Sequence, residues 1–224
     1  IKTEINRENS FLIATEGSSD SHILQKAFKL IKPSVCEFFR FIDVTSGHPF
    51  PGTGGLSKFA EGLVKIDVQN QIIFVLDNDS EGVEAFKKII KMKLPHNMSC
   101  ICLPNLKEFE SFPTCGPDGL TLSNINGTAA AIECYLDLTY SEYDSYTVRW
   151  TNYKKETGMY QGALEFKEYY AKRYLDTSEA KLIESKYDTS KLEALLNAII
   201  DACSKLSGAI RIEKIKSHYP NIWT

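Results

Sequence analysis

Apolar and polar positions follow two different periods in the first hundred residues. Four compact apolar runs predict buried strands, at residues 10–15, 37–44, 71–76 and 98–103. Three segments between them carry apolar residues at every third or fourth position and predict helices, at residues 20–32, 56–66 and 80–92. Strands that alternate with helices build a parallel sheet with helices on both faces. The pattern therefore predicts an α/β fold with a Rossmann-like parallel sheet flanked by helices.

The pattern is weaker after residue 104. A Gly- and Pro-rich stretch predicts a loop at residues 113–119, and two apolar stretches predict a short helix at 128–136 and a strand at 146–150. Helical spacing then returns in four segments, at residues 161–174, 178–186, 191–206 and 207–216. We therefore expect three parts: an α/β domain, an extension and a helical C-terminal region, over residues 1–136, 137–175 and 176–224.

The composition is that of an ordinary globular protein and excludes few functions. The chain of 224 residues is 43% hydrophobic and 25% charged, with a formal net charge of −3. This balance argues against a uniformly basic nucleic-acid coat, but it permits a local basic groove. No apolar run approaches the roughly 20 residues that a membrane span needs.

The six cysteines contain no CxxC pair, which disfavours a structural zinc site. Reduced thiols and the lack of a signal peptide are typical of a cytoplasmic protein, so we expect cytoplasmic localisation. The first residue is Ile1 rather than Met, so an absent portion of the same chain is among the partners considered.

Two acidic residues follow the first predicted strand. Glu16 leaves that strand, and Gly17 allows the backbone to turn sharply after it. Asp20 lies about one helical turn beyond Glu16, so both side chains can face one site. The alternative for Asp20 is that its carboxylate only favours the dipole at the start of a helix.

The third predicted strand runs directly into Asp77, Asn78 and Asp79. The two aspartates stand at alternate positions, so in extended geometry both point to the same side. Crowded carboxylate oxygens are the usual ligands of Mg²⁺ or Mn²⁺. Asp79 can instead cap the next helix, with Glu81 in its first turn. Because parallel strands end at one sheet edge, Glu16 and the two aspartates together favour a metal site there.

Two further features give additional candidates. Glu133 lies within the short apolar helix predicted at 128–136, where an acid is usually partnered or functional, although a half-exposed position is the alternative. The Gly- and Pro-rich loop before the second predicted helix is expected at the same sheet edge. His48, Gly54 and Gly55 in this loop could contact a phosphate, and a plain crossover loop is the alternative.

An apolar strand ending in Glu-Gly, a helix, and a later strand ending in Asp-x-Asp occur in this order over residues 10–103. This arrangement resembles the Toprim domain, which topoisomerases, bacterial primases and the overcoming-lysogenization-defect (OLD) nucleases share. A closer resemblance is to the Toprim-like portion of bacterial HEPN/Toprim-associated proteins, which are thought of as antiphage defence components. It extends to about residue 170 through the segments EGSSDSHIL, FIDV, GGLSKF, NQIIFVLDNDSEG, NGTAAAIECYL and YQGALEFK.

The resemblance implies a role for each acidic candidate. Glu16, Asp77 and Asp79 would hold the main Mg²⁺ or Mn²⁺ ion. Asp20 and Glu133 would complete a second site, and two ions about 4 Å apart suit phosphodiester cleavage. Glu16 could act instead as a general acid or base, the role proposed for the corresponding residue of topoisomerase-type Toprim domains.

The same resemblance supplies a lysine candidate and one departure. OLD nucleases use a downstream lysine near the scissile phosphate, and Lys167 is the candidate by position, with Lys154 and Lys155 as competitors. OLD-type sites often carry a small hydroxyl residue two positions before the later Glu. This chain has Ala131 there, which weakens the expectation of a second metal.

The sequence thus predicts a divalent-metal-dependent nuclease that cleaves DNA or RNA, with a role in antiphage defence. One alternative, favoured by Ala131, is a catalytically weak Toprim module that binds nucleic acid or regulates a HEPN-type partner. Another is a haloacid-dehalogenase-type phosphatase, but its Asp-x-Asp motif sits on the first strand and leaves Glu16 unexplained. Expected partners are nucleic acid, a HEPN domain or other defence partner, and a second copy of the chain, without a membrane.

Overall fold

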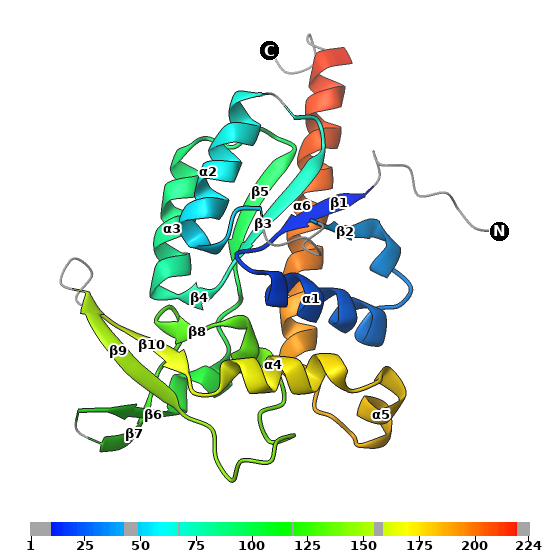
Figure 1. Cartoon of the computed structure of the whole chain (residues 1–224). Helices are drawn as coiled ribbons and strands as arrows, with labels where there is room; N and C mark the ends of the chain where they lie inside the picture. Colours follow the sequence, from blue (N-terminus) through cyan, green and yellow to red (C-terminus); the bar gives the residue numbers. More distant parts are fainter. Residues whose placement is uncertain (1–9, 43–48, 67, 118, 155–158, 219–224) are drawn as a thin grey trace.

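The fold is built on a four-stranded sheet in the order β2-β1-β3-β5, whose neighbouring strands all run parallel. The computed structural model describes residues 10–42, 49–66, 68–117, 119–154 and 159–218. The strands of this sheet are β1 (Phe11–Ala14), β2 (Phe39–Phe41), β3 (Gln71–Leu76) and β5 (Met98–Cys102). Helices cover both faces (Figure 1), which confirms the predicted α/β architecture with a Rossmann-like parallel sheet.

Each face of the sheet has its own pair of helices. One face packs against α1 (Ser18–Ile31) and α6 (Ser190–His218), and the other against α2 (Gly52–Lys65) and α3 (Ser80–Lys91). Ile73 of β3 contributes to the first core and Phe74 to the second. A strand buried on both faces must be apolar throughout, and each such side chain contributes about 1.5–3 kcal/mol on burial. The apolar run of β3 therefore fixes where the acids that follow it emerge.

The order of the strands reverses between β1 and β3. The chain passes from β1 through α1 to β2 on one side, and then crosses back to place β3 on the other side of β1. In open parallel sheets, ligands bind outside the carboxyl ends of the strands at such a switch point. Glu16 and Asp77 follow these two strands, so the topology brings them to the expected ligand-binding edge.

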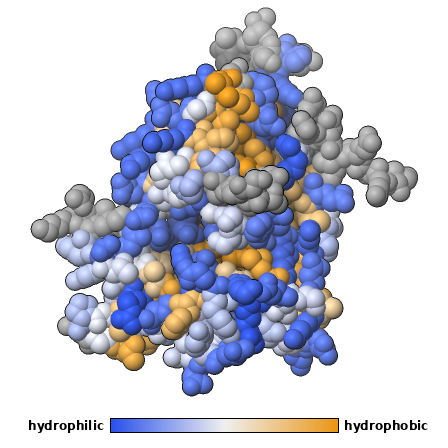
Figure 2. Space-filling model, viewed as in Figure 1, coloured by the Kyte–Doolittle hydropathy of each residue, from blue (hydrophilic) through white to orange (hydrophobic). Residues whose placement is uncertain are grey.

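A second sheet in the order β10-β9-β6-β7 lies beside the first. Its strands are β6 (Phe112–Gly116), β7 (Gly119–Ser123), β9 (Val148–Lys154) and β10 (Met159–Leu164). The short strands β4 (Asn78–Asp79) and β8 (Ala129–Ala130) pair with each other. Figure 2 shows a hydrophilic face with several apolar areas, one of which lies at the lower left, where Figure 1 places the β6–β7 hairpin. Leu120 and Leu122 of β7 are 77% and 67% exposed.

Several sequence predictions for this region are wrong. The predicted loop at 113–119 is the β6–β7 hairpin, and the predicted helix at 128–136 is β8 followed by the 3₁₀ helix η4 (Ile132–Tyr135). The predicted helix at 161–174 begins as β10, and α4 (Lys167–Asp176) follows it. Pairing with β9 makes this segment a strand. Gly162 suits the close approach of the two strands, because a Cβ added there would lie 2.7 Å from the side chain of Val148.

The first half of the chain needs smaller corrections. The predicted strand at 37–44 starts with the 3₁₀ helix η2 (Cys36–Phe38), and only β2 follows it. Helix α2 begins at Gly52, four residues before the predicted helix, so the expected loop is shorter. The remaining short elements are the 3₁₀ helix η3 (Lys107–Ser111) and α5 (Glu179–Glu184), the second of which matches the helix predicted at 178–186.

The C-terminal region is part of the main core. The two helices predicted at 191–206 and 207–216 are the single helix α6, whose Leu192, Leu195 and Ile199 pack in the same cluster as residues of α1 and β3. Within the described ranges, no helix, α6 included, has the length and apolar content to cross a membrane. All six cysteines belong to those ranges and are free thiols. The predicted division into three parts stays a prediction.

Lys26 connects α1 to the end of α4. Its ammonium donates hydrogen bonds to the backbone carbonyls of Tyr174 at 2.6 Å and Leu175 at 2.9 Å, and to that of Thr177. The last carbonyls of a helix lack partners within the helix, and a cation there also interacts favourably with the helix dipole. Lys26 therefore holds the C-terminal end of α4 against α1.

Candidate functional site

Glu16 joins the carboxyl ends of β1 and β3. Its Oε1 accepts a hydrogen bond from the backbone N–H of Asp77 at 2.9 Å. Its backbone carbonyl accepts one from the N–H of Gly52, the first residue of α2, also at 2.9 Å. The half-buried Glu16 side chain is thus fixed between two strand ends and a neighbouring helix.

Asp77 links this edge to the segment that carries Glu133. The Oδ1 of Asp77 accepts a hydrogen bond from the backbone N–H of Ile132 at 2.9 Å, which places η4 over the end of β3. On its other side, α3 starts directly against the Asp77 backbone. A Cβ added at Gly82 would lie 2.1 Å from the carbonyl oxygen of Asp77, so only glycine permits this approach.

Asp79 and Asp20 both accept hydrogen bonds from backbone N–H groups at the start of a helix. The Oδ1 of Asp79 accepts hydrogen bonds from the N–H groups of Glu81 at 3.0 Å and Gly82 at 2.7 Å, which confirms that Asp79 caps α3 and that Glu81 lies in its first turn. The Oδ2 of Asp20 accepts one from the N–H of Gly17 at 2.8 Å, which closes the turn before α1. Capping thus uses one oxygen of each side chain and leaves both acids at this edge.

Mutual repulsion and burial disfavour ionisation of the central acids. Burial raises the pKa of Glu16 from 4.5 to about 8, and the charges of Asp79 and Asp20 add to this effect against the hydrogen bond from Asp77. Burial also raises the pKa of Asp77 well above its usual value, together with the charges of Asp20, Glu16 and Glu133. The five acids predicted from the sequence are therefore close enough to interact electrostatically.

Glu133 and Lys167 interact electrostatically within this cluster. Glu133 is 5% exposed, and burial followed by the charge of Asp20 raises its pKa to about 7, although Lys167 opposes this shift. Lys167 is the first residue of α4 and follows Phe166, whose φ of 56° turns the chain out of β10. Burial lowers the pKa of Lys167, but the nearby carboxylates, Glu133 foremost, outweigh it and raise the net value. Lys167 is therefore charged at neutral pH.

The donor chemistry fits a hard divalent cation, because Glu16, Asp20, Asp77, Asp79 and Glu133 offer carboxyl oxygens, and a cation would favour their ionised forms. A closed ligand shell is not formed. In the part of the chain that the structure describes, no three or more His, Cys, Asp and Glu side chains gather as a metal-binding group. The hydrogen bonds give a reason, because four of these carboxylates each use an oxygen to accept a backbone N–H.

Sequence reasoning missed the polar contacts that connect β10 to the site. Ser80 Oγ donates a hydrogen bond to Gln161 Oε1, and Gln161 Nε2 donates one to Asp79 Oδ2 at 3.4 Å. Gln161 was not recognisable, because its segment predicts a helix. Asn78 was also missed: its side-chain amide donates to Asn105 Oδ1 at 2.8 Å and braces the segment between the two aspartates.

The phosphate-binding candidates lie in a different setting from the one predicted. Gly54 and Gly55 belong to the first turns of α2 rather than to a loop, and a Cβ added at Gly55 would lie 2.6 Å from the backbone of Phe50. Packing therefore accounts for Gly55. Gly54 lines a groove of about 610 Å³ between α2 and α3, in which the charged groups are Lys58, Lys88, Glu61, Glu81 and Glu84. Two further candidates, His48 and Lys155, lie outside the described residues. The side chain of Lys154 is outside them as well.

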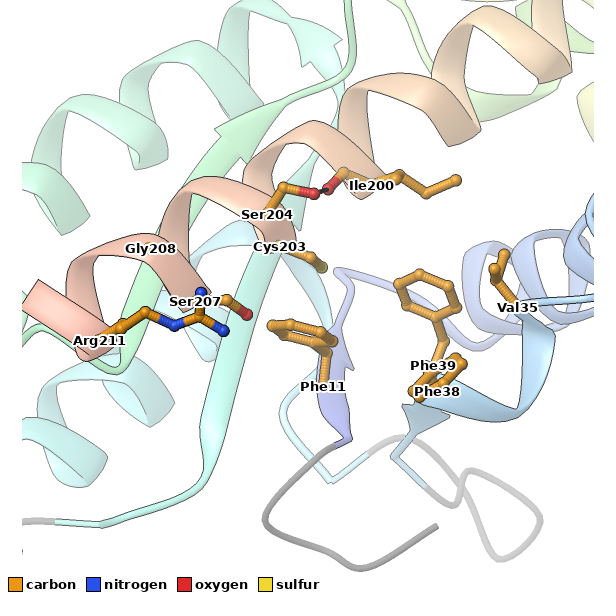
Figure 3. Close-up of a pocket in the computed structure, with 10 residues that line it drawn as sticks. All are labelled: Phe11, Val35, Phe38, Phe39, Ile200, Cys203, Ser204, Ser207, Gly208 and Arg211. Carbon is orange, nitrogen blue, oxygen red and sulfur yellow. Dashed lines mark hydrogen bonds between the residues drawn. The ribbon is translucent and has the colours of Figure 1, made fainter. Parts of the chain in front are cut away.

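An apolar cavity lies far from these acids, near the amino ends of β1 and β2. It has a volume of about 440 Å³ and opens between Phe11, Phe38 and Phe39 on one side and α6 on the other (Figure 3). Arg211 and Gly208 of α6 complete its wall. None of the five acids lines this cavity, so the acidic cluster and the apolar cavity are separate features of the molecule.

Comparison with protein-family models, with curated proteins and with solved structures finds no match to this chain. The class that fold and site define is an α/β protein with a Rossmann-like parallel sheet and an acidic cluster at its switch point. The finer assignment to the Toprim domain rests on the sequence motifs, and it enters below as a proposal.

Proposed function

We propose that the protein is a divalent-metal-dependent nuclease of the Toprim type, which cleaves phosphodiester bonds of DNA or RNA in antiphage defence. The observation that carries the proposal is the convergence of Glu16, Asp20, Asp77, Asp79 and Glu133 at one edge of the sheet, with the pKa values of three of them raised. Such mutual repulsion destabilises the fold, and perturbed acids of this kind cluster at functional sites.

The acids divide into two sets. Glu16, Asp77 and Asp79 would hold one Mg²⁺ or Mn²⁺ ion, and Asp20 and Glu133 would take part in a second. A bound divalent cation would offset the carboxylate charge and polarise the scissile phosphate. Gly82 supports this arrangement, because it allows α3 to begin directly behind Asp77.

Lys167 has a different role from the acids. Its ammonium is held near Glu133 and Asp77 and stays protonated, so it can stabilise the negative charge that develops on the phosphate in the transition state. Glu16 keeps the backbone of Asp77 in place through its hydrogen bond, and this fixes the end of β3 relative to β1. The chain therefore supplies positioning and charge rather than a covalent nucleophile.

A cleavage assay with one charge removed tests the proposal. Plasmid, single-stranded DNA and tRNA are incubated with Mg²⁺ or Mn²⁺ and wild type, Asp77→Asn or Asp176→Asn. We expect Asp77→Asn to lower the cleavage rate by about 100-fold or more. Asp176→Asn removes an exposed carboxylate that pairs with Lys172, and it should cleave like wild type. Equal rates for wild type and Asp77→Asn would contradict the proposed site.

The open ligand shell favours one second candidate, a Toprim module with little catalysis that binds nucleic acid or regulates a HEPN-type partner. Ala131 points the same way. In this case no substrate is cleaved under either ion, and Mn²⁺ leaves the melting temperature unchanged, because a ligand that binds only the native state must raise it. Tight association with a HEPN protein would then identify the regulatory role.

A further inference from the structure

The β9–β10 hairpin carries a cluster of three aromatic side chains, Trp150, Tyr153 and Tyr160, which we call the aromatic hairpin. The ring centroids of Tyr153 and Tyr160 lie 5.0 Å apart, and those of Trp150 and Tyr160 lie 6.2 Å apart. Tyr153 and Tyr160 are 53% and 49% exposed. The hairpin projects away from the body of the molecule (Figure 1), so about half of each tyrosine faces solvent.

Two glycines allow the Trp150 ring to pack closely against neighbouring strands. A Cβ added at Gly162 would lie 2.9 Å from the Trp150 ring, and one added at Gly116 would lie 3.2 Å from it. The indole therefore packs against backbone on neighbouring strands, and Tyr160 packs against the indole. The exposed rings are thus supported from beneath, and an aromatic surface that is already ordered loses little entropy when a ligand binds.

The aromatic hairpin is continuous with the acidic site. Gln161 directly follows Tyr160, and its side chain hydrogen-bonds to Ser80 and Asp79. The backbone N–H of Gly162 donates to the carbonyl of Thr128 at 3.3 Å, which fixes β10 beside β8. Tyr160 and Gln161 are adjacent residues of β10, with Cα atoms about 3.8 Å apart, so the residue that contacts Asp79 is joined directly to the aromatic hairpin.

The charge of this segment differs from that of the whole chain. Residues 148–164 contain three basic residues and one acidic residue, whereas the chain as a whole has a net charge of −3. Arg149 pairs with Glu165 at 2.6 Å and remains exposed at the side of β9. By sequence, the segment therefore has a net charge of +2, which favours a polyanion more than the net charge of the whole chain does.

Hairpin stability alone does not explain the exposed rings. Tyr153 and Tyr160 are directly opposite each other in the register, and such cross-strand pairs stabilise hairpins by up to about 1 kcal/mol. That effect needs contact between the two side chains, not the free half of each ring. In the same sheet, the exposed large apolar residues of β7 are the aliphatic Leu120 and Leu122. Within this sheet, the exposed aromatic side chains Tyr153 and Tyr160 lie on the hairpin that adjoins the acids.

We propose that the aromatic hairpin is a stacking platform for unpaired bases, so that the substrate is a single-stranded nucleic acid or a single-stranded end; this rests on the proposed nuclease function. Every base has a π face, so stacking on Tyr153 and Tyr160 accepts any sequence, while paired bases inside a duplex cannot reach the rings. The platform would lead the strand past Gln161 toward Asp79. DNA and RNA share this chemistry.

Binding measurements in EDTA test the platform apart from cleavage. Fluorescence anisotropy compares labelled oligo-dT, oligo-U and a DNA duplex of equal length on wild type and three double variants. Tyr153→Ala/Tyr160→Ala removes the rings, and Tyr153→Phe/Tyr160→Phe keeps them. Leu120→Ala/Leu122→Ala removes exposed apolar area elsewhere in the sheet. We expect the first variant to weaken single-strand binding by about 10- to 100-fold and duplex binding by less than about 2-fold, and the other two to bind like wild type.

A spectroscopic arm reports contact with the cluster directly. Trp150 and Trp223 are the two tryptophans of the chain, so Trp223→Phe leaves Trp150 as the sole indole. Oligo-dT or oligo-U should quench its fluorescence, and Tyr153→Ala/Tyr160→Ala in the same background should reduce this quenching at a fixed oligonucleotide concentration. Oligo-dT and oligo-U differ in the 5-methyl group of the base as well as in the sugar, so a comparison of oligo-dU with oligo-U identifies the preferred sugar.

The outcomes separate this proposal from the nuclease proposal. Unchanged single-strand binding by Tyr153→Ala/Tyr160→Ala, or equal loss for single strand and duplex, would overturn the platform, as would the absence of any single-strand binding by wild type. The rate of Asp77→Asn decides the nuclease independently. If Tyr153→Ala/Tyr160→Ala binds single strands more weakly but no protein cleaves, the platform is kept and the nuclease is rejected. If that variant binds like wild type and only Asp77→Asn loses cleavage, the nuclease is kept and the platform is rejected.

Discussion

The two ends of the parallel sheet differ in what is left unsatisfied. At the carboxyl ends of β1 and β3, half-buried acids repel one another, and burial raises the pKa of Glu16 to about 8. At the amino ends, Phe11, Phe39 and α6 leave an apolar cavity of about 440 Å³. At the first end, backbone hydrogen bonds hold acids that repel one another close together. At the second end, the cavity only removes packing contacts between apolar side chains. Stability can be gained at the second end without loss of chemistry, but not at the first.

Removal of Lys167 should give the largest effect at the acidic end. We expect Lys167→Met to lower the cleavage rate by about 100- to 1000-fold, because the transition state loses a preorganised positive charge. The initial rate under Mg²⁺ or Mn²⁺ measures this. Lys172→Met is the matched control, since Lys172 lies on the same helix and pairs only with the exposed Asp176 among the contacts described. Similar rates for the two variants would remove Lys167 from the site.

Gly82→Ala should disrupt the packing of α3 against the carboxyl end of β3 through a steric clash. The new methyl would lie 2.1 Å from the carbonyl oxygen of Asp77, so α3 must shift away from the strand end. We expect a loss of about 2–4 kcal/mol, which lowers the melting temperature by roughly 5–15 °C. Gly62→Ala in α2 is the control, because no described heavy atom lies within 4 Å of its added Cβ. A Gly82→Ala protein that melts with wild type would show that the close approach is not required.

The pH dependence of the metal-free protein should reveal the charge conflict. The folded-state pKa of Glu16 is about 8 and its ordinary value is 4.5, so its contribution to stability is complete below pH 4.5 and is lost as the pH rises toward 8. Glu16→Gln cannot ionise and should melt above wild type at pH 8 by on the order of 10 °C, and with a smaller difference at pH 5. A constant difference in melting temperature between Glu16→Gln and wild type from pH 5 to 8 would contradict this. Mn²⁺ should narrow the difference at pH 8.

A single methyl at the cavity end should have the smallest effect, and it should raise the melting temperature. Gly208 lies within α6, and among the described residues no heavy atom comes within 4 Å of a Cβ added there. Gly208→Ala should therefore stabilise the protein by about 0.5–1 kcal/mol through the lower entropy of the unfolded chain. The melting temperature should rise by roughly 1–4 °C with an unchanged cleavage rate. A lower melting temperature would mean that this part of α6 is already close-packed.

The sequence predicts the acidic end better than the rest of the molecule, for a local reason. β3 and α3 are recognisable because the apolar run is buried on both faces and Asp79 caps the helix that follows. The strand ends then place Glu16 and Asp77 together. β10 was not recognisable, because its helix-forming residues become a strand only through pairing with β9. Gln161 faces Asp79 for that reason, and no local pattern predicts it.

The ammonium of Lys26 has a consequence for Lys167, although the two are on different helices. α4 has 10 residues and is about 15 Å long; Lys26 holds its C-terminal end, and the left-handed turn at Phe166 directs its start. Asp20 lies six residues before Lys26 on α1, about 9 Å along the helix. The separation between an acid and the lysine of the site is therefore set by a second lysine that takes no part in the chemistry. A substitution that leaves the charges of the site unchanged can therefore still alter the distance between Asp20 and Lys167 by moving α4.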